Sequence, residues 1–315
     1  MKKRRLSHIQ FIALGFLSIV AVGTALLMLP FSTKSGEGAS FISALFTAVS
    51  SSCVTGLILH DTATYWSLFG QLVIICLIQL GGLGFMTVAL FTVQLFTKNT
   101  GLRRRALLAE SINTESLGGM RRLVRIIIIG TAIFEISGAL LLSIRFIPKF
   151  GLLKGIYYSL FHSISAFCNA GFDLMGSYSG EYSSFTAFSD DILVNVVIML
   201  LIVIGGIGFL VWEDILNHRF HFKRYKLHTK IVLVTTVVLI LGGAILLWLF
   251  EINGLNKGMS IKEQILTALF GSVTTRTAGF NTTDTALLTD SSKFLSSIFM
   301  FIGGSSGSTA GGAKT

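Results

Sequence analysis

The sequence predicts an all-α polytopic membrane protein built from repeated units, and three observations lead to this prediction. Hydrophobic residues make up 52% of the chain and charged residues only 13%, whereas soluble domains carry roughly 25% charged residues. Several uncharged runs are long enough to cross a bilayer, which takes roughly 20 apolar residues. A short glycine loop occurs three times, and each copy precedes a glycine pair in another apolar stretch. The repeating unit is therefore a helix, a short half-helix, a glycine loop and a second helix.

The first unit occupies residues 1–97. An uncharged run from Ile9 to Leu29 predicts the outer helix, and Phe41–Ser52 is apolar at helical spacing but too short to cross the membrane. It is therefore expected to be a half-helix that enters the membrane partway. The loop Val54-Thr55-Gly56 follows it, and the run Tyr65–Thr97 predicts the inner helix.

The second unit, residues 123–217, follows a basic linker at residues 98–122. A spanning helix is predicted over Ile126–Ile144, although Glu135 lies at its centre. The half-helix Leu152–Phe167 leads into the loop Asn169-Ala170-Gly171, and the inner helix lies in the run Ile192–Trp212.

The third unit, residues 231–315, follows a second basic loop at residues 218–230. It contains the spanning run Ile231–Phe250, the half-helix Ile261–Thr274 and the loop Thr277-Ala278-Gly279. Its inner helix is interrupted by many glycines from Gly303 onward, and such irregular backbone is tolerated at membrane depth only where it is buried or lines a wet cavity. We expect this chain to be a fragment whose remainder completes the third unit and adds a fourth.

The basic residues predict the orientation of the chain. The net charge is +10, and most of the lysines and arginines lie in three segments, residues 2–5, 98–125 and 219–230. Two membrane passes separate each segment from the next, so all three fall on one side, which the positive-inside rule assigns to the cytoplasm. The N-terminus is then cytoplasmic, the glycine loops enter from outside, and the charge gives no reason to expect nucleic acid as a partner.

The three loops have the composition of a cation filter. Backbone carbonyls can replace the water around a dehydrated K⁺ ion, and glycine permits the dihedral angles that direct them inward. The expected K⁺ ligands are the carbonyls of Val54, Thr55, Gly56, Asn169, Ala170, Gly171, Thr277, Ala278 and Gly279. For the glycine pairs 81–82 and 205–206, close helix packing is the better interpretation.

These features resemble the Ktr/Trk/HKT superfamily of potassium transporters, most closely its bacterial KtrB-type membrane subunits. The resemblance is carried by residues 52–57, 166–172 and 274–280, by the Gly-Gly-x-Gly-Phe runs at 81–85 and 205–209, and by residues 301–315. It implies four pseudo-repeats around one pseudo-fourfold pore, three of them in this chain and the third incomplete. Each repeat contributes one filter glycine, here Gly56, Gly171 and Gly279.

The resemblance also implies a gate in the inner helix of the third repeat. The small residues of this segment suit a flexible plug beneath the filter, its hydroxyls can hold it shut, and Lys314 can add an electrostatic barrier. The expected gating loop comprises Gly303, Gly304, Ser305, Ser306, Gly307, Ser308, Thr309, Ala310, Gly311, Gly312 and Lys314.

Partners and location likewise follow from the resemblance. It implies a multi-pass protein of the bacterial plasma membrane, surrounded by lipid, that forms a homodimer with one pore in each subunit. A cytosolic ring of nucleotide-binding regulatory subunits of the KtrA or KtrC type would bind it. K⁺ is the implied substrate and Na⁺ the coupling ion of a symport, with no cofactor in this chain.

Two charged residues are expected to support the filter. Arg276 precedes the third loop, where a free cation would repel K⁺, so its side chain should point behind the filter and bond backbone or a carboxylate. Glu135 needs a partner because an unpaired ion within the membrane is costly. The two could pair with each other, and His162 and Asn195 are other candidate neighbours.

Two sequence features bear on other functions. Residues Gly307–Thr315 nearly form a phosphate-binding loop, but Ala313 separates Gly312 from Lys314, so the pattern fails. No catalytic arrangement is evident, which predicts that the protein is not an enzyme. Two alternatives stay open: a non-conducting fragment or membrane scaffold, and a broken-helix secondary transporter for another solute. All three loops enter from one face, which favours a pore.

Overall fold

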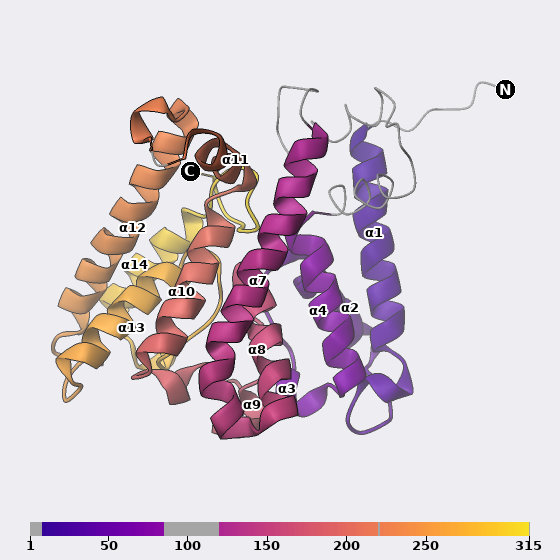
Figure 1. Cartoon of the computed structure of the whole chain (residues 1–315). Helices are drawn as coiled ribbons and strands as arrows, with labels where there is room; N and C mark the ends of the chain where they lie inside the picture. Colours follow the sequence, from indigo (N-terminus) through magenta and orange to yellow (C-terminus); the bar gives the residue numbers. More distant parts are fainter. Residues whose placement is uncertain (1–7, 85–119, 220, 315) are drawn as a thin grey trace.

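The computed structural model describes residues 8–84, 120–219 and 221–314. Within these ranges the regular structure is helical, and β pairing is limited to two isolated bridges. Two of the described helices, α7 (Met120–Phe150) and α12 (Leu227–Glu251), are long and apolar enough to cross a membrane. A third span is reached if α10 and α11, which meet at a bend of 92°, are counted together. The fold is thus the predicted all-α membrane architecture (Figure 1).

The first unit begins with a long helix that stops before a proline. Proline cannot continue the hydrogen bonding of a helix, and the chain turns at Pro30 into a short 3₁₀ segment. The half-helix starts where Ser40 caps it and ends one residue later than expected, whereas the inner helix is capped by Ser67 and ends at the glycine pair. The elements are α1 (His8–Leu27), η1 (Pro30–Ser32), α2 (Phe41–Cys53), α3 (Thr62–Tyr65) and α4 (Leu68–Gly82).

The second unit shows two differences from the predicted boundaries. Helix α7 begins at Met120, so the end of the predicted linker 98–122 is already helical, and the rest of that linker lies outside the described residues. The run expected as one inner helix is broken at Gly208, whose φ of 95° is accessible mainly to glycine. The further elements are α8 (Leu152–Phe167), α9 (Gly176–Ser179), η2 (Thr186–Phe188), α10 (Ile192–Gly206) and α11 (Phe209–His218).

The third unit repeats the same order of helices. Ser260 and Glu263 form a capping box at the start of the half-helix, which has the predicted bounds. Helices α11 and α12 extend into both ends of the basic loop predicted at 218–230, so that loop is only partly irregular. The elements besides α12 are η3 (Phe222–Arg224), α13 (Ile261–Thr274), η4 (Thr285–Leu287) and α14 (Asp290–Phe301).

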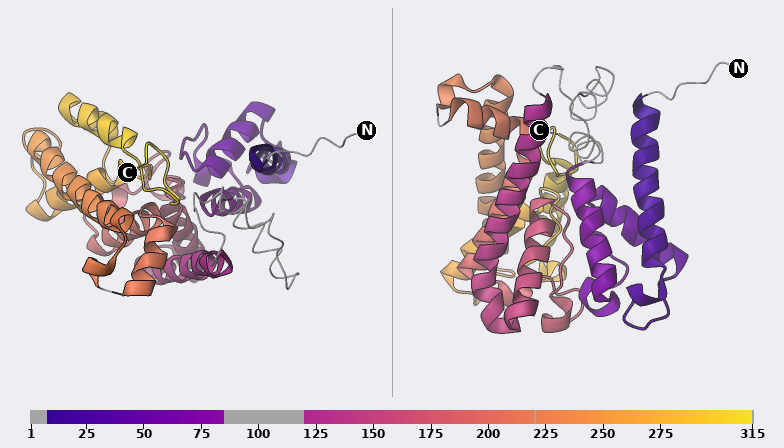
Figure 2. Two further views of the ribbon diagram at one scale, coloured as in Figure 1. Left: turned by 90° about the horizontal axis from the view of Figure 1, so that it is seen from above. Right: turned by 45° about the vertical axis from the view of Figure 1, so that its right-hand side comes forward.

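The units lie side by side, and the half-helices join them. Each half-helix packs most extensively against the long helix of its own unit, giving the pairs α1–α2, α7–α8 and α12–α13. Two half-helices also contact the inner helix of the preceding unit, in the pairs α4–α8 and α10–α13. Seen from above, the yellow loop at the end of the chain lies between the purple helices of the first unit and the orange helices of the third (Figure 2, left).

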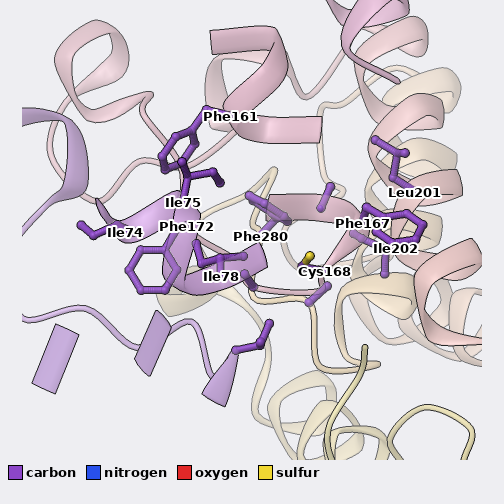
Figure 3. Close-up of a cluster of buried hydrophobic side chains, with 14 of the residues drawn as sticks. Ile74, Ile75, Ile78, Phe161, Phe167, Cys168, Phe172, Leu201, Ile202 and Phe280 are labelled. Carbon is purple, nitrogen blue, oxygen red and sulfur yellow. The ribbon is translucent and has the colours of Figure 1, made fainter. Parts of the chain in front are cut away.

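The hydrophobic core lies where the units meet. Ile74, Ile75 and Ile78 of α4 are buried near Phe161 and Phe172 of the second unit (Figure 3). Phe167 packs beside Leu201 and Ile202 of α10 in the same cluster, and Phe280 lies between the two groups. The core therefore holds the ends of the half-helices in place.

The described basic segments lie at one end of the molecule. The start of α7, α11 and the start of α12 gather there, and Arg122 Nη2 donates to Asn217 Oδ1 at 2.6 Å (Figure 1). The short helices α3 and α9 lie at the opposite end. The other basic residues used to predict orientation, 2–5 and 98–119, lie outside the described residues.

Candidate functional site: three glycine loops and the segment packed against them

Three loops begin at the C-terminal ends of the half-helices. We call them loop 1 (Cys53–Leu57), loop 2 (Cys168–Phe172) and loop 3 (Arg276–Phe280); they follow α2, α8 and α13. The last carbonyls of a helix lack intrahelical partners and give that end a partial negative charge. A cation near the loops would therefore face the favourable ends of three helix dipoles.

The loops share a rare backbone conformation. Val54, Asn169 and Thr277 stand at equivalent positions, two residues before the loop glycine, and have φ angles of 56°, 56° and 63°. Residues with a side chain seldom adopt positive φ, and β-branched residues such as Val54 and Thr277 do so least readily. The glycines that follow, Gly56, Gly171 and Gly279, have φ angles of 77°, 71° and 81°. Three copies of the same strained turn make the loops structurally equivalent.

A hydroxyl group from each half-helix anchors the end of its loop. Ser50 Oγ donates to the carbonyl of Leu57 at 2.7 Å and Ser165 Oγ to that of Phe172 at 2.7 Å. In the third unit Thr274 Oγ1 donates to the carbonyl of Phe280 at 2.6 Å. These three residues are missing from the site predicted from the sequence. The signal was available: a hydroxyl stands six residues before Gly56 and Gly171 and five before Gly279.

The loops converge. A Cβ atom added to Gly56 would lie 2.7 Å from the carbonyl oxygen of Ala170, and one added to Gly171 would lie 2.7 Å from that of Ala278. A Cβ at Gly279 would lie 3.2 Å from the Cα of Gly171. Loop 2 thus touches both of its neighbours through backbone atoms of the predicted ligand residues. Ala170 and Ala278 themselves are buried, with their side chains packed in the core.

Glycines also let the inner helices approach the half-helices. A Cβ at Gly81 would lie 2.0 Å from the carbonyl oxygen of Ser52, and one at Gly205 would lie 1.9 Å from that of Phe167. Ser52 and Phe167 occupy the same place in their units, four residues before the loop glycine. The contacts agree with the packing role expected for these glycine pairs.

The glycine-rich segment, Gly303–Lys314, leaves α14 and folds back on itself. Gly303 N donates to Ala313 O at 3.0 Å, and Gly304 N donates to Gly311 O at 3.1 Å. Lys314 Nζ donates to the carbonyl of Ala310. Gly312 has a φ of 73°, which completes the turn.

The same segment is attached to the break between α10 and α11. Ser305 N donates to Gly206 O at 3.0 Å, Thr309 N to Gly205 O at 3.3 Å, and Phe209 N to Gly307 O at 2.8 Å. A Cβ at Gly208 would lie 2.7 Å from the carbonyl oxygen of Ser306, so the glycine at the break is needed for this contact. The structure therefore brings all the predicted gating residues into one folded segment beside loops 2 and 3.

Arg276 and Glu135 do not form the ion pair considered from the sequence. Glu135 Oε2 instead accepts a hydrogen bond from Gln79 Nε2 at 3.2 Å, because Glu135 faces α4 and α8 rather than the third unit. The guanidinium nitrogens of Arg276 are buried and have no hydrogen-bond partner among the described residues. Its backbone is bonded on both sides: Arg276 N donates to Val273 O at 3.1 Å, and Arg276 O accepts from Asn169 Nδ2 at 3.4 Å.

The other candidate neighbours of these charges bond elsewhere. His162 Nδ1 donates to Tyr158 O at 2.7 Å, which leaves Nε2 to accept from Leu174 N at 3.0 Å. Asn195 Nδ2 donates to the carbonyls of Phe188 and Asp191 at 2.7 and 2.8 Å. Both side chains thus stabilise turns of their own unit.

Three acidic residues that follow the loops in the sequence accept hydrogen bonds from backbone amides. Asp61 Oδ1 accepts from Ala63 N at 2.9 Å, and its other oxygen accepts from Tyr182 N at 3.0 Å. Asp173 and Asp284 each accept from an amide two residues further on. In the described part of the chain, no three His, Cys, Asp or Glu side chains gather as a metal-binding group.

Comparison with known proteins places this arrangement in a family. A sequence model of the TrkH family, described as a cation transport protein, matches residues 8–315. The chain belongs to the TrkH family. This membership confirms the resemblance found in the sequence and the prediction that the chain is not an enzyme.

Two relatives and one solved structure are similar to this TrkH-family chain over nearly its whole length. It is 43% identical over 320 residues to the potassium/sodium uptake protein NtpJ of Enterococcus hirae, covering 100% of this chain and 69% of that protein. It is 41% identical over 309 residues to the Ktr system potassium uptake protein B of Bacillus subtilis, covering 97% and 67%. The crystal structure of the potassium transporter TrkH from Vibrio parahaemolyticus is similar with a TM-score of 0.73 at 17% identity, covering 99% of this chain and 60% of that one, which shows the shared fold.

Proposed function

We propose that the protein takes up monovalent cations, foremost K⁺, across the membrane through a filter lined by the carbonyls of loops 1 to 3. The observation that carries this proposal is the convergence of three loops with the same left-handed turn at the ends of three half-helices. Carbonyl groups and helix C-termini both favour a dehydrated cation. The ligands are the nine backbone carbonyls predicted from the sequence.

K⁺ is proposed because of the relatives. Those at 43% and 41% identity are named as potassium/sodium and potassium uptake proteins. This chain spans 69% and 67% of their lengths, so the proposal concerns the activity of the whole transporter to which these loops belong.

The glycine-rich segment is the proposed gate. It is folded, yet it consists largely of small residues, and it lies against loops 2 and 3 at their end nearest to α11. A segment held there by a few hydrogen bonds can block the path of a cation and can be displaced at low cost. The role of Lys314 as an electrostatic barrier is part of this proposal.

The proposal also includes partners. Two relatives are named as the Ktr system potassium uptake proteins B and D, which favours a membrane subunit that works with separate components. The basic stretch between α11 and α12, where Lys223 and Arg224 are exposed, is a surface that a cytosolic KtrA- or KtrC-type ring could contact. The homodimer and the Na⁺-coupled symport expected from the resemblance complete this picture.

Rubidium uptake tests the proposal. The protein would be produced from its natural gene in bacteria that lack K⁺ uptake systems, beside a Gly171→Ala variant. We expect uptake by the parent and a large loss in the variant. The positive φ at position 171 is unfavourable for alanine, and the added Cβ would press on loop 3. Gly242→Ala is the matched control, since the space around Gly242 is open and alanine suits a helix.

Two outcomes would contradict the proposal. Equal uptake by the parent and by Gly171→Ala, at equal abundance in the membrane, would exclude loop 2 from the cation path. No uptake by a correctly inserted parent would favour the scaffold alternative.

A further inference from the structure

We infer that the side chains of Asn169 and Thr277, two residues of the proposed filter, form a lock that holds the gating segment closed. The inference rests on the proposed function of the loops and of the glycine-rich segment. It makes these two residues positioning residues for the gate in addition to carbonyl donors for the cation. The lock joins the filter directly to the element that blocks it.

The first contact of the lock is made by Thr309 of the gating segment. Its Oγ1 lies 3.0 Å from the carbonyl oxygen of Phe167 and 3.0 Å from Asn169 Oδ1. Thr309 and Asn169 are both buried, with exposed fractions of 7% and 1%. A buried hydroxyl without an acceptor costs roughly 1–3 kcal/mol, so this contact favours the closed position of the segment.

The second contact is made by Thr277 of loop 3. Gly311 N in the gating segment donates to Thr277 Oγ1 at 2.9 Å. The two contacts are made by residues two positions apart in the segment, and they use two different loops. Asn169 also connects the loops with each other, because its Nδ2 donates to the carbonyl of Arg276.

The composition of the three loops supports this role. The equivalent left-handed position is Val54 in loop 1, Asn169 in loop 2 and Thr277 in loop 3. Asparagine tolerates positive φ, which would explain Asn169 alone, but threonine gains nothing over valine in that conformation. The polar side chains stand in the two loops that the gating segment contacts, and the apolar one stands in loop 1.

The other side of the segment is held by backbone bonds that side-chain changes leave intact. These are the bonds to Gly205, Gly206 and Phe209 at the break between α10 and α11. Loss of one lock contact should therefore loosen the segment without unfolding it. Because the locking residues also carry filter carbonyls, a cation that shifts those carbonyls would alter the lock, and the coupling must act in both directions.

Hydrogen exchange of the gating segment tests the lock without reference to transport. The protein from its natural gene, in detergent or nanodiscs, would be compared with Thr309→Val and Thr277→Val, which remove a hydroxyl and keep the shape. A net hydrogen bond contributes about 0.5–1.5 kcal/mol, so the amides of residues 303–313 should exchange roughly two- to tenfold faster. Thr309→Ser and Thr277→Ser keep the hydroxyl and should restore protection.

Thr236→Val is the matched control for the valine variants. Thr236 is buried in α12 and its hydroxyl has no partner among the described residues, so the same substitution should leave exchange of residues 303–313 unchanged. Unchanged exchange in both Thr309→Val and Thr277→Val would overturn the lock. So would an equal increase in Thr236→Val, because it would show a loss of stability that does not depend on these contacts.

Rubidium flux into proteoliposomes separates the lock from the proposed function. Faster exchange together with higher flux in the valine variants supports both. Faster exchange in a protein that carries no rubidium supports the lock and contradicts the filter. Normal flux with unchanged exchange supports the filter and overturns the lock.

Discussion

At the scale of single residues, a hydroxyl group of each half-helix fixes the last carbonyl of its loop. Ser50, Ser165 and Thr274 bind the carbonyl that follows each loop glycine, so those carbonyls are directed to the half-helices. They are thereby removed from the set that could face a cation, which ends at the glycine. The nine carbonyls proposed as ligands all precede these anchored carbonyls in the chain.

Replacing one of these hydroxyls should weaken cation discrimination. In Ser50→Ala the carbonyl of Leu57 loses its donor and the hydroxyl of Thr55 loses its acceptor. Each lost bond costs about 0.5–1.5 kcal/mol, and the loop becomes free to widen. We expect stronger inhibition of rubidium uptake by Na⁺ in this variant.

The neighbouring residue supplies the control for Ser50. Ser51 is also buried in α2, but its hydroxyl has no partner among the described residues. Ser51→Ala should therefore leave the competition between Na⁺ and rubidium unchanged. The same response in both serine variants would mean that the Ser50–Leu57 bond does not shape the filter.

The sequence predicted the loops but not their anchors. Three copies of a glycine loop are visible without a structure, because repetition distinguishes them from chance. The spacing to the loop glycine is a signal, but it is six residues in two units and five in the third. Ser50 belongs to a run of three serines, so this spacing does not separate it from Ser51. The side chain of Arg276 was expected to bond backbone or a carboxylate, but among the described residues its guanidinium has no hydrogen-bond partner. The sequence does not show which groups lie beside a buried side chain in three dimensions.

At the scale of helices, glycine pairs fix the distance between inner helices and half-helices. Gly205 in α10 lies against the end of α8, so close that a Cβ would lie 1.9 Å from the carbonyl of Phe167. That carbonyl also accepts a hydrogen bond from the hydroxyl of Thr309 in the gating segment. The packing of α10 therefore affects the loop and the gating segment together.

Two adjacent substitutions test this packing. Gly205→Ala should force α10 away from α8 and lower the free energy of unfolding by roughly 1–3 kcal/mol, as overpacking does. Gly206→Ala should change it little, because its Cβ would meet nothing closer than 3.7 Å. Thermal unfolding in detergent measures both, and equal effects would contradict the proposed contact.

Helix boundaries were predicted well for the half-helices. Helices α8 and α13 have the predicted bounds, and α2 differs by one residue at its end. The bend at Gly208 was not predicted, because the hydrophobic run continues through it to Trp212. Its cause is tertiary: the break lets Phe209 N reach Gly307 O in the third unit.

At the scale of the whole molecule, the half-helices α8 and α13 each bridge two units. Cys168 at the end of α8 lies against Gly82 of α4, where a Cβ would come within 2.7 Å of the sulfur. Gln79 of α4 donates to Glu135 of α7 in the same contact. These contacts set the position of the second unit relative to the first.

Replacing one partner of the Gln79–Glu135 hydrogen bond should destabilise the protein more than replacing both. Gln79→Leu leaves the buried carboxyl group of Glu135 without this donor, and a buried polar group that loses its partner costs roughly 1–3 kcal/mol. The double variant Gln79→Leu/Glu135→Leu should be less destabilised than Gln79→Leu alone. Thermal unfolding of the single and double variants measures this difference, and additive losses would show that the two side chains act independently.

The central claim is that loops 1, 2 and 3 together bind a cation. Anomalous diffraction from crystals of the protein grown with thallium, a heavy substitute for K⁺, tests it most directly. We expect an anomalous peak in contact with carbonyls of at least two loops, at the level of Gly56, Gly171 and Gly279. Peaks elsewhere with none between the loops would contradict the claim.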